Sequence, residues 1–140
     1  MKRIVVGVDG SAESEKALRL AAELARPLGA ELLVTYVIPP TVPPAETYIL
    51  VMADIEAAGL RHGESVVARC EKALEGRGVA LRTQIRSGDP ASALAELAEQ
   101  EQADLVVVGS RGLGAVKRML LGSTSNRLVH VSQRPVLVVP

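Results

Sequence analysis

Apolar residues follow two different patterns along this chain. Short uninterrupted runs of Val, Ile and Leu alternate with longer stretches in which apolar residues recur every three or four positions. The runs are typical of strands buried on both faces of a sheet, and the longer stretches are typical of amphipathic helices. The runs predict strands at residues 3–8, 31–38, 79–86, 104–109 and 135–139. The stretches between them predict helices near 12–27, 48–75 and 90–101, and a last short helix over 125–132.

Turn and cap residues support these boundaries. Ser11 stands where the N-cap of the first long helix belongs, and Asp89 followed by Pro90 supplies a cap and a first helical residue for the third. Four prolines in PPTVPPAET, residues 39–47, exclude a helix there and predict a surface loop. Strands and helices that alternate at this spacing predict one α/β domain over 1–140, with a parallel sheet covered by helices on both faces.

Composition narrows the range of functions. Of the 140 residues 48% are apolar, yet Phe and Trp are absent, so the core must be aliphatic and a stacking platform for single-stranded nucleic acid is not expected. Sixteen basic and sixteen acidic residues cancel, which argues against nucleic acid or an anionic membrane as a general partner. No signal peptide or membrane-spanning run is seen, so we expect a cytoplasmic protein.

No catalytic group stands out. Cys70 shares helical spacing with Val66 and Leu74, so we expect a core position rather than a nucleophile. His62 and His130 have no Cys, Asp or second His at ligand spacing, which favours packing or surface roles over metal binding. Neither histidine has a visible nucleophile partner, so any hydrolysis should be slow.

The segment GSRGLGAVKRMLLGSTSN, residues 109–126, holds four glycines, three basic residues and four hydroxyl side chains, but no acid. It directly follows a predicted strand, and the carboxyl ends of parallel strands are where open α/β sheets bind ligands. Glycine-rich turns and helix N-termini direct backbone N–H groups at anions. The chain has no acidic residue after Asp104, which makes its last quarter a local cationic field. Asp9 and Gly109 should face each other across the crevice between the first and fourth strands.

Spacing excludes two common phosphate-binding loops. Gly109 and Gly114 lead into Ala115 rather than the Gly-Lys-Ser/Thr of a Walker loop. The first strand ends in GVDGS, which lacks the three spaced glycines of a dinucleotide fingerprint. The segment instead has Gly, two residues, Gly, nine residues and Gly-Ser, at Gly109, Gly112, Gly122 and Ser123.

This spacing resembles the ATP-binding subclass of the universal stress protein family. The resemblance extends over the whole chain, through VVGVDGS, SGDP, DLVVVGSRG, LLGSTSNRLVHVS and RPVLVV in the family's order. It implies an open five-stranded parallel sheet in the order 3-2-1-4-5, of the adenine nucleotide alpha hydrolase-like kind. It also implies a homodimeric stress or signalling module that binds ATP, with Mg²⁺ bridging the phosphates.

The resemblance assigns roles to individual positions. Asp9 matches the acidic residue that holds ribose, and Val37 matches the position whose backbone faces adenine. Gly109 would approach the ribose and the first phosphate. The remaining matched positions cradle the phosphates, and they are Gly112, Gly122 and Ser123, with the hydroxyl of Thr124 or Ser125 nearby. Arg111 and Lys117 are added from charge alone.

Other interpretations stay open at this point. Asp9 would be only a helix cap, the glycines only tight turns, and Ser123 only an N-cap. A weak ATPase and a structural dimer without nucleotide are the competing functions.

The strand at 135–139 predicts how two copies would meet. PVLVV is short, apolar and β-branched, and in the order 3-2-1-4-5 it lies at the edge of the sheet. Paired with its own copy across a two-fold axis, it would bury Val136, Leu137, Val138 and Val139. A helix or the PPTVPPAET loop folding over this edge is the alternative.

Overall fold

The computed structural model describes residues 1–110 and 121–140, which form alternating strands and helices. The strands are β1 (Arg3–Val8), β2 (Glu31–Ile38), β3 (Ala80–Ser87), β4 (Leu105–Gly109) and β5 (Val136–Val139). The helices are α1 (Ala12–Leu28), α2 (Tyr48–Leu74), α3 (Pro90–Gln100) and α4 (Ser123–Val131). Each predicted element is present; the largest difference is α4, which begins two residues earlier than predicted.

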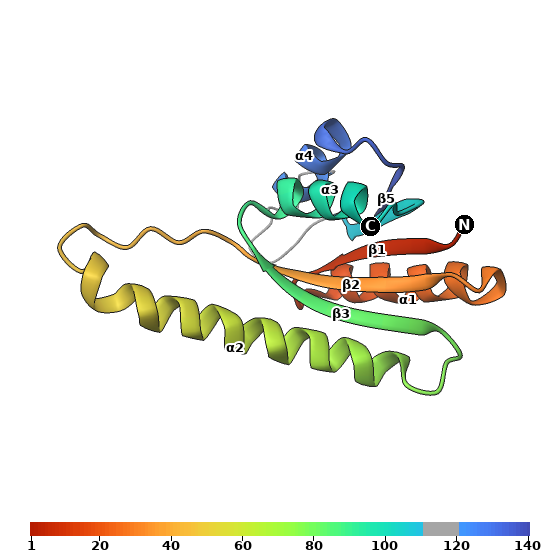
Figure 1. Cartoon of the computed structure of the whole chain (residues 1–140), viewed down its shortest axis with the longest axis horizontal. Helices are drawn as coiled ribbons and strands as arrows, with labels where there is room; N and C mark the ends of the chain where they lie inside the picture. The colour runs from red at the N-terminus through yellow and green to blue at the C-terminus, as the bar shows by residue number, and fades with distance from the viewer. Residues whose placement is uncertain (111–120) are drawn as a thin grey trace.

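The five strands form one parallel sheet in the order β3-β2-β1-β4-β5 (Figure 1). The chain first builds outward from β1 through β2 to β3, and then returns to place β4 on the other side of β1. The order therefore reverses between β1 and β4, and such a reversal opens a crevice at the carboxyl ends of the two strands. The predicted fold class and strand order are confirmed.

Two helices cover each face of the sheet, with α1 and α2 on one side and α3 and α4 on the other (Figure 1). Each layer encloses its own core of aliphatic side chains. The largest side chains with almost no exposure are Ile4, Leu18, Leu32, Leu33, Leu97 and Leu128. Close packing of Val, Leu, Ile and Ala therefore provides most of the core, to which Tyr36 adds an aromatic ring.

Local signals define the helix ends. The Ser11 hydroxyl accepts the backbone N–H of Ser14 at 3.2 Å and caps α1, and Gly29 ends that helix with a left-handed φ of 62°. The Asp89 carboxylate accepts the N–H of Ser92 at 3.0 Å and caps α3, with Pro90 as its first residue. Both predicted caps are confirmed.

An ion-pair network joins the strands near their amino ends. Arg3 on β1 contacts Glu31 at 3.2 Å and Glu101, just after α3, at 2.9 Å. Arg82 on β3 contacts the same two carboxylates, at 2.7 and 3.2 Å. Two guanidinium groups thus alternate with two carboxylates and link three neighbouring strands to the end of α3.

Candidate functional site

The turn after β1 holds Asp9 in a fixed geometry. One carboxylate oxygen of Asp9, Oδ1, accepts the N–H of Ser11 at 2.9 Å, and the N–H of Asp9 donates to the Ser14 hydroxyl at 3.3 Å. Ser11, not Asp9, is the N-cap of α1. One oxygen of Asp9 therefore shapes the turn, which fixes the direction of the other.

Gly109 ends β4 against the first turn of α1. A Cβ at this position would lie 2.8 Å from the carbonyl carbon of Glu13 and 2.9 Å from the backbone nitrogen of Ser14. Backbone atoms cannot yield as a flexible side chain can, so only glycine fits here. Because the Ser14 hydroxyl also accepts the N–H of Asp9, Gly109 and the Asp9 turn both lie next to Ser14. Packing inside the protein is enough to explain this glycine.

An arginine from α2 lies over the same turn. Gly10 has a φ of +85°, and a Cβ there would come within 3.0 Å of a guanidinium nitrogen of Arg69. A cavity of about 130 Å³ lies beside the turn, between α1 and α2, and Cys70 is among its lining residues. Arg69 could not be predicted from the sequence, because no local pattern connects a residue in the middle of α2 with the end of β1.

Val37 lies level with Asp9 at the end of the neighbouring strand. Val8 pairs with Tyr36, so the next residues of the two strands are Asp9 and Val37. The Val37 side chain is 7% exposed and packs in the core below α3, which leaves its backbone as the group near the crevice. Burial, and to a lesser extent the charge of Asp9, raise the pKa of the Tyr36 hydroxyl.

Helix α4 begins at the same edge of the sheet. Gly122 is its N-cap, with φ −72° and ψ 170°, an extended backbone that any residue adopts. Ser123 is the first helical residue, so the interpretation of Ser123 as the N-cap is wrong. Within the described part of the chain, no side chain caps this helix start. Its first-turn N–H groups and the exposed Ser123 hydroxyl are the donors that α4 presents.

Ser110 connects β4, β5 and α4, although no pattern in the sequence indicates this role. Its N–H donates to the carbonyl of Val139 at 2.7 Å. Its carbonyl accepts the N–H of Gly122 and, at 2.8 Å, the hydroxyl of Ser125. The Ser125 hydroxyl is also 3.2 Å from the carbonyl of Gly122, so its only proton is already directed at two protein acceptors.

The cationic field predicted for the last quarter of the chain is partly neutralised. Arg127 on α4 pairs with Asp89 at 3.1 Å, and Arg134 before β5 pairs with Glu99 at 2.6 Å. Both carboxylates belong to the region of α3, which packs beside α4, so a count along the sequence could not reveal them. Arg111, Gly112 and Lys117 lie outside the described residues.

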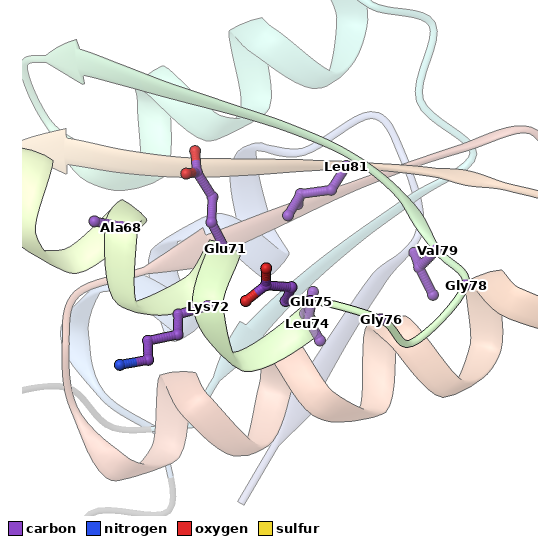
Figure 2. Close-up of a pocket in the computed structure, with 9 residues that line it drawn as sticks. All are labelled: Ala68, Glu71, Lys72, Leu74, Glu75, Gly76, Gly78, Val79 and Leu81. Carbon is purple, nitrogen blue, oxygen red and sulfur yellow. The ribbon is translucent and has the colours of Figure 1, made fainter.

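An open groove of about 600 Å³ lies between the end of α2 and the start of β3 (Figure 2). The carboxylates in it are those of Glu71 and Glu75, and the Glu71 carboxylate accepts the hydroxyl of Thr83 at 2.7 Å. This groove is at the edge where the strands begin, opposite the crevice at their carboxyl ends. None of the described site residues predicted from the sequence lines it.

Other chemical groups do not add to the site. Burial raises the pKa of the Cys70 thiol to about 11, so the thiolate is scarce near neutral pH. Across residues 1–110 and 121–140, no three His, Cys, Asp or Glu side chains are grouped as metal ligands. No helix in the same ranges is long and apolar enough to span a membrane.

Comparison with known proteins identifies the family. Residues 1–140 match the model of the universal stress protein family. The chain belongs to this family. It is 40% identical over 142 residues to a universal stress protein of Mycolicibacterium smegmatis, covering 97% of this chain but only 47% of that relative's length. It is 34% identical to the universal stress protein YxiE of Bacillus subtilis, covering 98% of this chain and 97% of the relative.

Solved structures agree in fold. The universal stress protein UspA of Lactobacillus plantarum superposes with a TM-score of 0.90 at 24% identity, covering 99% of this chain and 97% of that one. A universal stress protein in complex with cAMP is 28% identical with a TM-score of 0.65, covering 99% and 96%. An Archaeoglobus fulgidus relative in complex with dAMP has a TM-score of 0.75 at 19% identity, covering 100% and 98%.

Proposed function

We propose that this universal stress protein binds ATP across the carboxyl ends of β1 and β4 and acts in the cytoplasm as a nucleotide-dependent homodimer. The observation that carries the proposal is that the Asp9 turn, Gly109 and the start of α4, which no side chain among the described residues caps, lie together where the strand order reverses. A carboxylate for ribose and N–H donors for phosphate are two kinds of group that α/β proteins use to hold a nucleotide.

Each part of the nucleotide has a matching group. The second oxygen of Asp9 would accept the ribose hydroxyls, because the first is bonded to Ser11. The Val37 backbone would face adenine. The phosphates would lie at Gly122, Ser123 and Thr124, where α4 directs N–H groups and the positive end of its dipole. Arg111 and Gly112 remain proposed phosphate ligands from sequence.

Ser125 has a different place in the proposed site. Ser125 is 2% exposed, and its hydroxyl donates to backbone carbonyls. To donate to a phosphate, the hydroxyl would have to break these hydrogen bonds. We therefore assign Ser125 to the support of the cradle rather than to the ligand. Mg²⁺, if it accompanies ATP, would be held mainly by phosphate oxygens.

Adenine nucleotides bound to family members support the ligand class. One structural relative at 28% identity is a complex with cAMP, and a more distant one is a complex with dAMP. Both ligands contain adenine, a pentose and phosphate, which are the parts that the proposed groups would recognise.

The two edges of the sheet differ in a way that supports dimerisation through β5. The edge strand β3 carries Arg82, Gln84 and Arg86, and charged edges resist pairing with another strand. The other edge strand, β5, reads VLVV. The loop at 39–47 lies at the far side of the molecule in Figure 1 and does not cover it. Val129 and Val131 on α4, which contacts β5, are 46% and 43% exposed.

Two measurements test the proposal. Mass spectrometry of the ligand released from purified protein is expected to find an adenine nucleotide, and calorimetric titration of the emptied protein is expected to show ATP binding. No bound nucleotide, together with no heat and no thermal shift at millimolar ATP, would favour the structural dimer. Turnover assayed with and without magnesium separates a binding module from a slow ATPase.

A further inference from the structure

The proposed phosphate cradle and the proposed dimer edge are joined through one buried residue. Ser110 is 4% exposed and lies between the end of β4 and the start of α4. Its N–H bonds the carbonyl of Val139, the last residue of β5, at 2.7 Å. Its carbonyl bonds the N-cap of α4 and the Ser125 hydroxyl, the latter at 2.8 Å. A single residue thus carries hydrogen bonds to both places.

The direction of the β5 backbone extends this connection to the edge. Pro135 and Val139 direct their carbonyls at β4, because they accept the N–H groups of Val106 and Ser110. Backbone groups alternate along a strand, so Val136 and Val138 direct theirs outward to the free edge. The Val139 carbonyl, which Ser110 holds, is therefore one residue from the outward backbone groups of Val138, to which a second copy would hydrogen-bond.

We propose that Ser125 is a positioning residue which couples nucleotide occupancy at the start of α4 to dimerisation through β5. This inference rests on the proposed function. A phosphate at Ser123 and Thr124 would fix the first turn of α4, and Ser125 would pass that restraint to the Ser110 carbonyl. The Ser110 N–H would then hold the end of β5 in the extended form that the partner strand requires. When ATP orders this segment, the partner strand no longer has to supply the entropy cost of ordering it, which gives positive coupling between the two binding events.

Linkage makes the inference measurable. If ATP strengthens the dimer, the dimer must bind ATP more tightly than the monomer, and because each dimer has two sites, the change in the dimer constant is the product of the two per-site affinity ratios. We expect saturating ATP to lower the dissociation constant of the wild-type dimer by about fivefold or more, within the usual range of coupled sites. In Ser125→Ala, the dimer dissociation constant without ATP is expected to exceed the constant at saturating ATP by less than about twofold. The ATP concentration that saturates each variant is taken from that variant's own ATP titration.

Sedimentation equilibrium with and without ATP is the experiment, and Thr83→Val is its control. Thr83 also loses a hydroxyl hydrogen bond, but it lies on β3 at the opposite edge of the sheet. The control is expected to keep the wild-type ratio of the two dimer constants. A wild-type dimer indifferent to ATP, or weakened by it, overturns the coupling, as does a Ser125→Ala protein that keeps the full ratio.

A second measurement needs no variant. Hydrogen exchange of the Ser110 amide in the wild-type dimer is expected to slow when ATP is added, and unchanged exchange at saturating ATP overturns the inference. Failure of the proposed function looks different in the same experiments. A protein that binds no ATP, or forms no dimer at any concentration, removes the proposed function and the coupling with it.

Discussion

At the scale of single residues, the glycines of the site are subject to different structural constraints. Gly109 is explained by the backbone of α1, which leaves no room for a Cβ. Gly122 has an extended backbone that other residues adopt, so its conformation does not require glycine. In the proposed site a phosphate would approach the backbone of Gly122, which is itself buried. The spacing in the sequence places both glycines in one motif, and only the structure shows that their backbones differ.

Replacing Gly122 by valine tests whether an anion approaches there. A branched side chain at the start of α4 would occupy the space that a phosphate needs, so the variant is expected to lose ATP binding while it remains folded. Ser123→Ala removes one hydrogen bond to a charged group, which is worth roughly 1–3 kcal/mol, and is expected to weaken binding by about tenfold or more. Calorimetric titration measures both, with circular dichroism as the test of folding. Unchanged ATP affinity in Gly122→Val would remove this part of the assignment.

The second oxygen of Asp9 predicts discrimination by the sugar. A carboxylate that accepts both ribose hydroxyls should favour ATP over 2′-deoxy-ATP, because the missing hydroxyl leaves a desolvated acceptor unpaired. Asp9→Ala is expected to erase that preference as well as weaken binding. Competition titrations of the two nucleotides against wild type and variant measure it. A variant that still strongly prefers the ribo form would show that Asp9 serves only the turn.

At the scale of elements, pattern and caps predicted most boundaries because local physics sets them. Ser11 and Asp89 cap their helices within a few residues of sequence, so nothing distant is needed to find them. The start of α4 was misplaced because Gly122, a residue without a capping side chain, occupies the cap. Arg69 and Ser110 were missed for another reason: their importance comes from neighbours that only the folded chain brings near.

The ion-pair network at the amino ends of the strands predicts a dependence on acid. Hydrogen bonds from Arg82, and then from Arg3, hold the pKa of Glu31 below its usual value. A carboxyl with a lowered pKa in the folded state contributes stability above its unfolded pKa, about 4.3, which is lost as the pH falls below it. Glu31→Gln is therefore expected to cost roughly 0.5–1 kcal/mol at pH 7 and progressively less toward pH 3.

Thermal unfolding followed by circular dichroism between pH 7 and pH 3 measures this difference. Glu64→Gln, an exposed carboxylate on α2, is the control and should follow wild type closely. A constant gap between Glu31→Gln and wild type over the whole range would mean that packing, rather than charge, explains the loss.

At the scale of the whole molecule, topology decides where chemistry can occur. Alternating strands and helices predicted a parallel sheet, while the order 3-2-1-4-5 came from family resemblance and is confirmed. That order puts β1 beside β4 and so joins segments about a hundred residues apart. It also leaves two different edges, of which β3 is charged and β5 is apolar. We therefore expect the proposed association through β5 to depend on the fold and not on any one motif.

Val138→Pro is the most direct test of association through β5. The N–H of Val138 points away from β4, as the bonds of Pro135 and Val139 establish, so proline removes a donor from the free edge without removing one from the β4 ladder. The variant is expected to shift toward monomer while the other strands keep their pairing. Val138→Ala, which shortens the side chain but keeps the donor, should remain largely dimeric. Sedimentation velocity at micromolar concentration distinguishes these states, and a wild-type monomer, or a dimer indifferent to Val138→Pro, would place the contact elsewhere.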